Sequence, residues 1–299
     1  MFNSLKFKVI LFGFIFTFFS SFGQSYFLGL FNSSIREALS ITHGQFGSIY
    51  ASATLCSSLL LIWVGKKIDD VNIFKFAFFV TILLSFACFF FSRITSVFLL
   101  FIAIFLMRFS GQGMMSHTAS TTISRYFTQT RGRALSISWF GLSSAEFIMP
   151  VLMVYLLTII DWQNLWLIFS ITVLIVLPIA SFLLIKNLNL DSRETNDENI
   201  KDIEIKQWKR REVIKDYRFY IISLNMLAMP WIFTGFAVFQ SFVQTSKGWG
   251  PYVIAQSFMS YSILSVLTLF LSGFLIDKFT SRKLLIYMNI PLLLSVIVL

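Results

Sequence analysis

The sequence predicts an all-α membrane protein, built as a bundle of spanning helices, and three observations support this prediction. First, 57% of the 299 residues are hydrophobic and 18% are aromatic, whereas only 13% carry a charge. A soluble domain of this size needs a more polar surface than this composition supplies. Second, apolar segments of about 20 residues, the length that a helix needs to cross a bilayer, recur along the chain. Third, the basic residues gather on alternate connections between these segments, as in polytopic membrane proteins.

Nine apolar segments account for most of the chain. A helix rises about 1.5 Å per residue and the hydrocarbon core is about 30 Å thick, so all but the last segment have ample length to cross. The first segment begins like a secretory signal peptide, but its apolar run continues past Ser20 and Ser21, so we read it as a retained span. The predicted spans are residues 8–31, 46–64, 73–92, 95–123, 134–160, 163–185, 217–245, 252–276 and 284–299.

The distribution of Lys and Arg sets the expected orientation. With the N-terminus on the inner side, 20 of the 24 basic residues fall in inner segments and 3 in outer segments, and Arg108 remains in mid-span. Positive residues accumulate on the cytoplasmic side of spanning helices, so this asymmetry predicts a multi-pass protein of the plasma (inner) membrane with a cytoplasmic N-terminus. The same bias explains the formal net charge of +10 without a nucleic-acid partner.

A polar stretch divides the spans into six and three. Its first part is mixed in charge and is expected to be a flexible, solvated linker. Its second part, IEIKQWKRREVIKD (203–216), is typical of an amphipathic helix on the inner membrane surface, with a solvated charged segment as the alternative. The expected domains are a six-helix bundle over 1–186, a cytoplasmic linker over 187–216 and an incomplete bundle of about three helices over 217–299.

One short motif occurs twice. GKKIDD (65–70) follows the second span and GFLIDK (273–278) follows the eighth, each as Gly-x-x-Ile-Asp at the expected inner end of a helix. The two copies are 208 residues apart for both the Gly and the Asp. Two halves built on one plan, with the solute site between them near the bilayer midplane, are typical of secondary transporters.

These residues resemble those of the major facilitator superfamily, whose best-known motif is a Gly-x-x-x-Asp-[Arg/Lys] loop after helix 2 that recurs after helix 8. GFLIDKFTSRK (273–283) fits this motif well. GKKIDDVNIFK (65–75) keeps the Gly and the first Asp but has Asp70 where a base is usual, and it lacks the later Gly and the first bases. A second stretch, RYFTQTRGRALSISWFGLSSAEFIMP (125–150), is similar to the loop and fifth helix of the monocarboxylate and oxalate–formate type branch.

The resemblance implies twelve helices in two six-helix halves, so this chain is expected to lack the last three helices. It also implies that the two motif loops open and close the inner side of the transporter. The residues that would carry this gating role are Gly65, Asp69, Gly273, Asp277, Lys278 and Arg282.

Arg108 is the expected centre of the solute site. It lies about 20 Å from the outer face, at a depth where an arginine costs on the order of 2.5–3.5 kcal/mol. Gln112 follows at i+4 on the same helical face, and Glu146 in the fifth span lies at a matching depth. Two hypotheses remain open. Either Arg108 and Glu146 form a purely structural ion pair, or Arg108 binds an anionic group of the solute, with Glu146 as its partner in the empty state or as a proton acceptor.

Other polar groups are weaker candidates. Gln24 in the first span and Asn225 in the seventh are added as solute ligands because each places an amide inside an apolar segment. His43 falls in an expected outer loop and His117 on the face of the fourth span opposite Arg108. Neither these histidines nor the two cysteines, which lie in separate apolar segments, predict a metal centre, a disulfide or a cofactor.

The sequence favours a secondary transporter over an enzyme, because His, Asp and Cys do not cluster at helix ends as a membrane enzyme would need. The expected function is the movement of a small solute, an organic anion, by alternating access, with a coupling proton as one hypothesis. The alternatives are a proton-driven exporter of hydrophobic compounds and an inactive, truncated transporter fragment.

Overall fold

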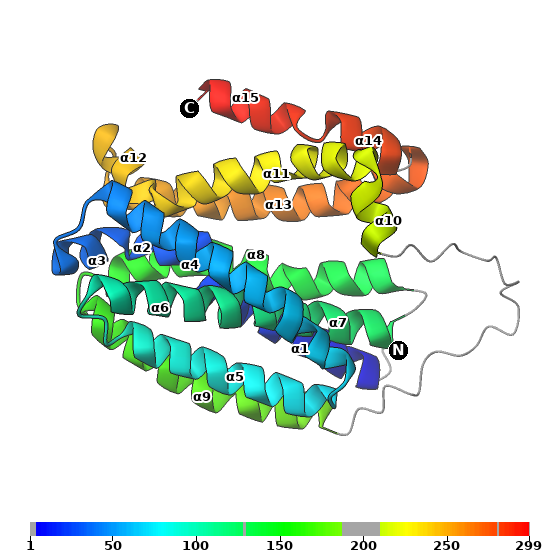
Figure 1. Cartoon of the computed structure of the whole chain (residues 1–299), viewed down its shortest axis with the longest axis horizontal. Coiled ribbons are helices and arrows are strands. Elements are labelled where there is room, and N and C mark those ends of the chain that lie inside the picture. Colours follow the sequence, from blue (N-terminus) through cyan, green and yellow to red (C-terminus); the bar gives the residue numbers. More distant parts are fainter. Residues whose placement is uncertain (1–3, 128–129, 187–209, 280, 299) are drawn as a thin grey trace, which may run out of the picture. The chain divides into compact units, whose positions relative to one another are not determined.

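The computed structural model describes residues 4–127, 130–186, 210–279 and 281–298. Within these ranges the chain is helical almost throughout and forms no strand (Figure 1). In the described ranges eight helices are long and apolar enough to cross a membrane, so the prediction of an all-helical membrane protein is confirmed. The ninth predicted span corresponds to a shorter apolar stretch, Lys283–Val298. The candidate spans are Leu5–Gly23, His43–Asp69, Ile73–Phe91, Val97–Tyr126, Arg131–Leu156, Trp162–Ile185, Tyr217–Val238 and Pro251–Leu269.

The helices form two compact units. The first unit comprises Met1–Glu194 and Ala237–Val266, and the second comprises Thr195–Phe236 and Leu267–Leu299. Residues 237–266, which the sequence analysis assigned to a second bundle, therefore pack within the first unit, and the division into bundles at 186 and 217 stays a prediction. Residues 187–209 lie outside the described residues. Of the expected surface helix, only Arg210–Lys215 are described, and they form α10.

The first span is broken where the sequence predicted one continuous helix. It consists of α1 (Ser4–Ser20), the single 3₁₀ turn η1 (Ser21–Gly23) and α2 (Ser25–Leu30), and it is followed by α3 (Asn32–Leu39). A second break occurs in the seventh span, where α11 (Tyr217–Val238) ends and α12 (Gln240–Ser246) begins around Phe239. Neither break is marked by a proline at the break itself.

The fourth span contains a π-helix, η3 (Arg108–Met115), between two α-helical parts. π-helices are rare and are often found at functional sites. The remaining elements of the first unit are α4 (His43–Val64), η2 (Gly65–Asp69), α5 (Ile73–Phe91), α6 (Val97–Met107), α7 (Ser116–Tyr126), α8 (Arg131–Leu156), α9 (Trp162–Ile185) and the part of α13 (Pro251–Phe279) up to Val266.

Polar residues in the short connections start several of these helices. Thr42 and Gln45 form a capping box at α4, in which each side chain bonds the backbone N–H of the other residue. Asn72 caps α5 by accepting from two backbone N–H groups, and Ser96 caps α6 in the same way with one. The polar residues in the connections between hydrophobic segments thus determine where these helices begin.

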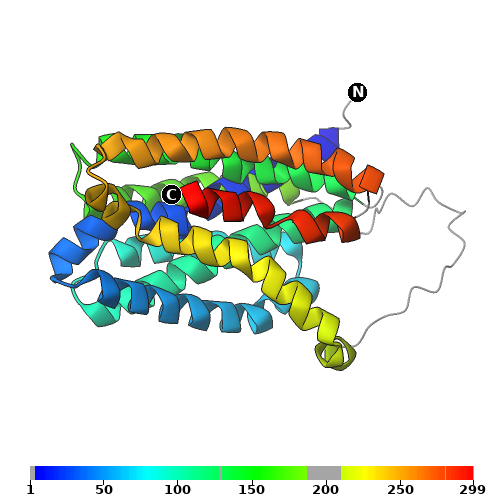
Figure 2. The same cartoon turned by 90° about the horizontal axis from the view of Figure 1, so that it is seen from above.

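Small and hydroxyl side chains let the helices of the first unit approach closely. At Gly141 a Cβ would collide with the α1 backbone at Phe14, and Thr17 Oγ1 donates to the carbonyl of Ser138 at 2.5 Å, which joins α1 to α8. On the other side of the unit, Ser85 of α5 and Ser170 of α9 each donate to the carbonyl of the other, at 2.9 and 2.8 Å. Such contacts are typical of helix packing in a bilayer. Figures 1 and 2 show these long helices lying side by side.

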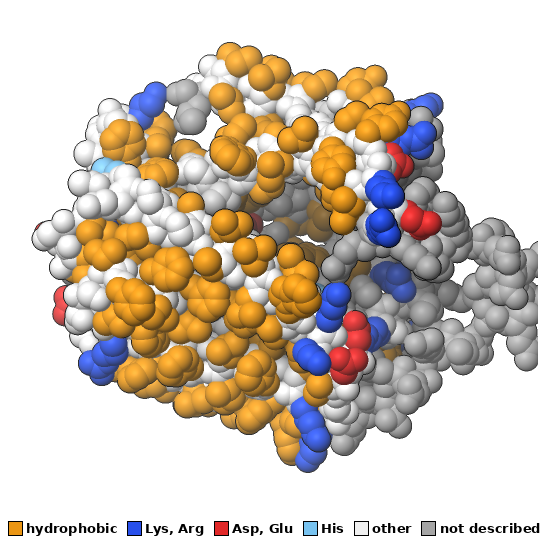
Figure 3. Space-filling model, in the orientation of Figure 1, with side chains coloured by type: hydrophobic (Ala, Val, Ile, Leu, Met, Phe, Trp, Pro, Cys, Tyr) orange, Lys and Arg blue, Asp and Glu red, His pale blue; other side chains and the backbone are white. Residues whose placement is uncertain are grey.

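The surface of the first unit fits a lipid environment along the helices. Large apolar side chains on α4, α5 and α9 are exposed, among them Leu59, Trp63, Phe79 and Leu183. Figure 3 shows hydrophobic side chains over the length of the helices, whereas Lys and Arg appear towards their ends. We call the end formed by η2, the start of α5 and the end of α7 the basic end, because it holds Lys66, Lys67, Lys75 and Arg125.

The described part of the second unit contains α10, most of α11, α14 (Ser281–Tyr287) and α15 (Ile290–Val298). Asn225 of α11 connects these helices. Its Nδ2 donates to the carbonyl of Leu285 at 3.0 Å, and it accepts from Asn289 Nδ2 through its backbone and side-chain oxygens.

Candidate functional site

The break in the first span exposes backbone groups at the centre of the first unit. Ser21, Phe22 and Gly23 form one 3₁₀ turn, and Gln24 is extended with φ −79° and ψ 151°. A break of this kind frees carbonyls from their helical hydrogen bonds. Gly23 lies so close to Gly111 of η3 that a Cβ on either residue would collide with the backbone of the other segment. These two glycines allow the broken segment and η3 to meet backbone against backbone, beside Arg108.

Arg108 is bound to this break. It is only 7% exposed, and its Nη1 donates to the freed carbonyl of Gly23 at 3.0 Å and to Ser25 Oγ at 3.2 Å. The carbon of its guanidinium group lies 5.4 Å from the centre of the Tyr50 ring, and the Tyr50 hydroxyl is hydrogen-bonded to Ser25 Oγ at 2.9 Å. A carbonyl, a hydroxyl and an aromatic face therefore compensate part of the positive charge. The Nε of Arg108 is buried and has no hydrogen-bond partner among the described residues.

A pocket with a volume of about 230 Å³ lies beside Arg108. It is formed by α4 and η3, and Arg108 and Gln112 both line it, so the structure brings these two sequence-predicted residues together. Hydroxyl groups from α4 make the opposite wall partly polar. The complete lining is Ser57, Ser58, Leu61, Arg108, Gln112 and Gly113.

Glu146 and Arg108 do not form the direct ion pair that was expected as one possibility. Within the described part of the chain, no ion pair links the two side chains, since Arg108 bonds to the first span instead. Glu146 lies on α8 and is 8% exposed. The physical reason is that equal depth fixes only one coordinate. Arg108 bonds to the broken first span, whereas Glu146 lies on a different helix, α8.

The other two candidate ligands lie in different surroundings. Gln24 is the extended residue of the break, next to the residues that hold Arg108, and its backbone N–H donates to the Ser21 carbonyl at 2.9 Å. Asn225 belongs to the second unit, where its amide is used in the contacts with Leu285 and Asn289. Those contacts explain Asn225 as a structural residue, and its role as a solute ligand stays a prediction.

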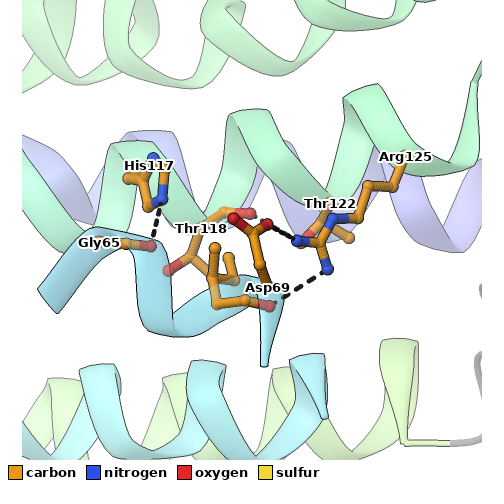
Figure 4. A network of polar contacts seen from close by, with 7 residues as sticks. Gly65, Asp69, His117, Thr118, Thr122 and Arg125 are labelled. Carbon is orange, nitrogen blue, oxygen red and sulfur yellow. Dashed lines mark hydrogen bonds and ion pairs between the residues drawn. The ribbon is translucent and has the colours of Figure 1, made fainter. Parts of the chain in front are cut away.

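Hydrogen bonds and an ion pair connect the first copy of the repeated motif to α7 (Figure 4). His117 donates from Nε2 to the carbonyl of Gly65 at 2.9 Å, and Arg125 donates to the carbonyl of Ile68 at 3.2 Å and forms an ion pair with Asp69. His117, near the start of α7, thus bonds to the first residue of η2 and does not line the pocket beside Arg108. The sequence analysis did not identify Arg125 as the partner of Asp69; its two bonds to η2 became visible only in the structure.

The second copy of the motif falls in the region that is least completely described. Gly273, Asp277 and Lys278 lie in the last turns of α13, and Arg282 lies in α14. The positions of their side chains are outside the described part of the structure. The gating role of both loops therefore stays a prediction.

Sequence reasoning missed several residues of the Arg108 site. Gly23, Ser25 and Tyr50 hold the guanidinium group, yet each is an ordinary residue of an apolar span. The run SSFGQS (20–25) was the available signal, because glycine and serine weaken a helix when they cluster. For Tyr50 the sequence holds no comparable signal.

Metal chemistry has no support in the described ranges. No group of three or more His, Cys, Asp or Glu side chains lies close enough there to hold a metal ion.

Comparison with known proteins points to one family. The sequence model of the family described as "Major Facilitator Superfamily" matches residues 13–299 of the chain. No curated protein sequence matches it.

Two solved structures resemble the fold. One is a bacterial homolog of the human lysosomal transporter Spinster in an inward-facing and unoccupied conformation, with 18% identity and a TM-score of 0.69. The other is a bacterial Spinster homolog in an inward-facing and occupied conformation, with 17% identity and a TM-score of 0.64. The alignments cover 94% and 93% of this chain but only 64% and 62% of those proteins, so the chain spans less than two thirds of their length. At this identity the likeness supports the fold alone.

Proposed function

Because the chain belongs to the major facilitator superfamily, we propose that it carries a small organic anion across a membrane by alternating access, with Arg108 as the residue that binds the anion. Membership of the superfamily supports transport as the general activity. The buried guanidinium group and the pocket beside it support a small anion as the class of solute.

The observation that carries the proposal is the incomplete use of Arg108. Only Nη1 makes hydrogen bonds to the protein within the described residues, and Nε is buried without a partner. The Nε and Nη2 hydrogens form the edge of a guanidinium group that grips a carboxylate through two parallel bonds. A buried donor without a partner is unfavourable, so an anion that accepts from this edge gains affinity.

The surroundings of Arg108 favour a small anion over a large one. The pocket has a volume of about 230 Å³, and Gln112, Ser57 and Ser58 add hydrogen-bonding groups to its wall. Gly23 and Ser25 hold the other edge of the guanidinium group, which fixes its plane before the solute arrives. Such preorganisation reduces the loss of side-chain conformational entropy that accompanies binding.

Uptake into proteoliposomes tests the proposal. Radiolabelled carboxylates of increasing length are offered to the purified chain, with and without a proton gradient. We expect saturable uptake that Arg108→Gln abolishes and Arg108→Lys impairs sharply, since an ammonium group does not replace a planar fork. Arg93→Gln is the matched control, because Arg93 is exposed and stacks only on Phe89. Unchanged uptake by Arg108→Gln would leave Arg108 with a structural role only.

Three finer hypotheses from the sequence remain proposals. The similarity of residues 125–150 to the monocarboxylate and oxalate–formate type branch agrees with a carboxylate at Arg108. A coupling proton would need an acceptor, and Glu146 is the buried carboxylate available in the described part of the spans. A proton-driven exporter of hydrophobic compounds is disfavoured by the polar wall of the pocket, and an inactive fragment predicts no uptake of any carboxylate.

A further inference from the structure

We propose that Leu61 of α4 and Gly113 of η3 limit the size of the anion, so that the solute is a carboxylate with a short carbon chain. This inference rests on the proposed function, because it concerns the part of the solute that extends away from Arg108. It makes Leu61 and Gly113 specificity-determining residues of the pocket that they line together with Arg108.

The pocket has room for only a few atoms. Its volume is about 230 Å³. A group the size of a water molecule takes up about 30 Å³ in a liquid, so the pocket holds about seven such groups. A carboxylate bound to Arg108 fills part of this space with its carbon and its two oxygens, which leaves room for a chain of about four carbons.

Leu61 supplies the apolar part of the pocket wall. Among the described residues that line the pocket it is the one with an apolar side chain, since the other side chains there are polar and Gly113 has none. The hydroxyl groups of Ser57 and Ser58 donate to the carbonyl of Thr54 at 2.8 and 2.9 Å, so they remain available to a solute as acceptors. A carbon chain gains from contact with apolar atoms and loses where it covers polar ones, so we expect it to lie against Leu61.

Gly113 determines where the Leu61 side chain lies. A Cβ at Gly113 would be 3.1 Å from Leu61 Cδ2 and 3.3 Å from Leu61 Cδ1, which is closer than ordinary van der Waals contact. The two methyl groups of Leu61 therefore occupy their place in the wall because position 113 has no side chain. A methyl group added there fills space at the wall and displaces Leu61, and both effects reduce the room for the solute.

A hydrogen bond close to this contact holds the two walls of the pocket at a fixed spacing. Gly65 follows Leu61 by four residues, and His117 follows Gly113 by four residues. His117 Nε2 is bonded to the Gly65 carbonyl at 2.9 Å, about one helical turn beyond the contact of Leu61 with Gly113 (Figure 4). A size limit requires such support, because walls that separate freely would admit a longer chain at little cost.

A purely structural role of Leu61 predicts a different result. If Leu61 only packs α4 against η3, its truncation lowers stability and leaves the relative affinities for short and long carboxylates unchanged. A size limit changes their ratio instead, since one methylene in an apolar pocket alters selectivity by about tenfold or more. Misfolding reduces the amount of binding for all chain lengths alike, so the ratio separates the two roles.

The test measures the binding of propanoate, pentanoate and heptanoate to the full chain in nanodiscs by calorimetry, with empty nanodiscs to correct for partition into lipid. We expect the wild-type protein to bind pentanoate most tightly. Leu61→Ala should raise the affinity for heptanoate relative to pentanoate about tenfold, and Gly113→Ala should lower the affinity for pentanoate relative to propanoate about tenfold. Leu59→Ala is the matched control, because Leu59 lies on the same helix, is 53% exposed and does not line the pocket.

Each outcome decides a separate point. If Arg108→Gln abolishes binding but Leu61→Ala and Gly113→Ala keep the wild-type ratios, the proposed function stands and the size limit is wrong. A wild-type affinity that is highest for heptanoate would also overturn the size limit. If Arg108→Gln binds the carboxylates as the wild type does while Leu61→Ala still shifts the ratio, the size limit stands and Arg108 is not the anion site. Absence of binding of all three compounds to the wild type would overturn both.

Discussion

Arg108 shows how a buried cation is held without a carboxylate. Its partners are the carbonyl of Gly23, the hydroxyl of Ser25 and the ring of Tyr50. None of these neutralises the charge, so the guanidinium group keeps a net attraction for an anion. An ion pair with Glu146 would have cancelled that attraction. At the scale of the residue, a functional role for Arg108 is therefore favoured over the purely structural ion pair, which the structure lacks.

Tyr50 offers a test of this arrangement. Tyr50→Leu removes the ring and the hydroxyl, whereas Tyr50→Phe removes only the hydrogen bond with Ser25. Since a desolvated cation–π contact contributes up to about 2 kcal/mol, we expect Tyr50→Leu to lower thermal stability in nanodiscs clearly and Tyr50→Phe to lower it by less than half as much. Equal losses in the two variants would show that the hydroxyl, and not the ring, stabilises Arg108.

The burial of Arg108 and Glu146 within spanning helices was predictable from the sequence, but their partners were not. A charged residue in the middle of a span normally faces the interior of the bundle. The direction of a side chain around the helix depends on an unbroken helical repeat, and η3 interrupts that repeat at Arg108 itself. Carbonyls become partners only where a helix breaks, and hydropathy does not reveal the break after Ser20.

At the scale of elements, the contact between the broken span and η3 depends on two glycines. A Cβ at Gly23 would meet the backbone at Met107, Gly111 and Gln112. Backbone atoms cannot move aside as a flexible side chain can, so we expect Gly23→Ala to destabilise the protein by about 1–3 kcal/mol. The same variant should weaken anion binding, because it pushes the Gly23 carbonyl away from Arg108.

Gly132 provides the control for this prediction. It lies in the first turn of α8, and a Cβ there would meet no atom within 4 Å. Gly132→Ala should leave stability unchanged or raise it by up to about 1 kcal/mol, since alanine favours a helix more than glycine does. Melting curves of both variants in nanodiscs check the pair. A Gly23→Ala variant as stable as Gly132→Ala would contradict the close approach.

Two neighbouring aspartates in the loop at the basic end allow a structural role and a gating role to be tested separately. Asp69 and Asp70 have the same side-chain exposure of 68%, but Asp69 pairs with Arg125 of α7, whereas Asp70 pairs only with Lys67, three residues before it. Exposed ion pairs contribute at most about 1 kcal/mol, so neither Asp69→Asn nor Asp70→Asn should change thermal stability much. We expect Asp69→Asn to reduce the rate of uptake and Asp70→Asn to preserve it. Equal uptake rates in the two variants would remove the gating role of Asp69.

Element positions were the most predictable feature of the fold. Hydropathy located the eight longer spans because lipid demands a continuous apolar length, and that demand is visible in any window of the sequence. The predicted start of the third span, residue 73, coincides with the first residue of α5 after its cap Asn72, whereas α4 begins at His43, before the predicted start at residue 46. The run SSFGQS (20–25) is a local signal for the break near Gly23. The break near Phe239 has no comparable signal, and it lies beside a contact with a distant segment, the bond from Asn32 Nδ2 to the Val238 carbonyl at 2.6 Å.

At the scale of the whole molecule, the basic asymmetry predicts which ends of the helices face the cytoplasm. The basic end of the first unit holds Lys67, and Ser246 lies in the connection between the seventh and eighth spans. Positive residues are retained on the cytoplasmic side during insertion, so we expect position 67 to be inside the cell and position 246 to be outside.

Single cysteines at these positions test the orientation with a thiol reagent that does not cross membranes. Cys56 is exposed and must first be replaced by serine, whereas Cys88 is buried. Intact cells should be labelled at position 246 only, and position 67 should react after the cells are opened. Labelling of Lys67→Cys in intact cells would reverse the orientation and, with it, the assignment of the basic end to the cytoplasm.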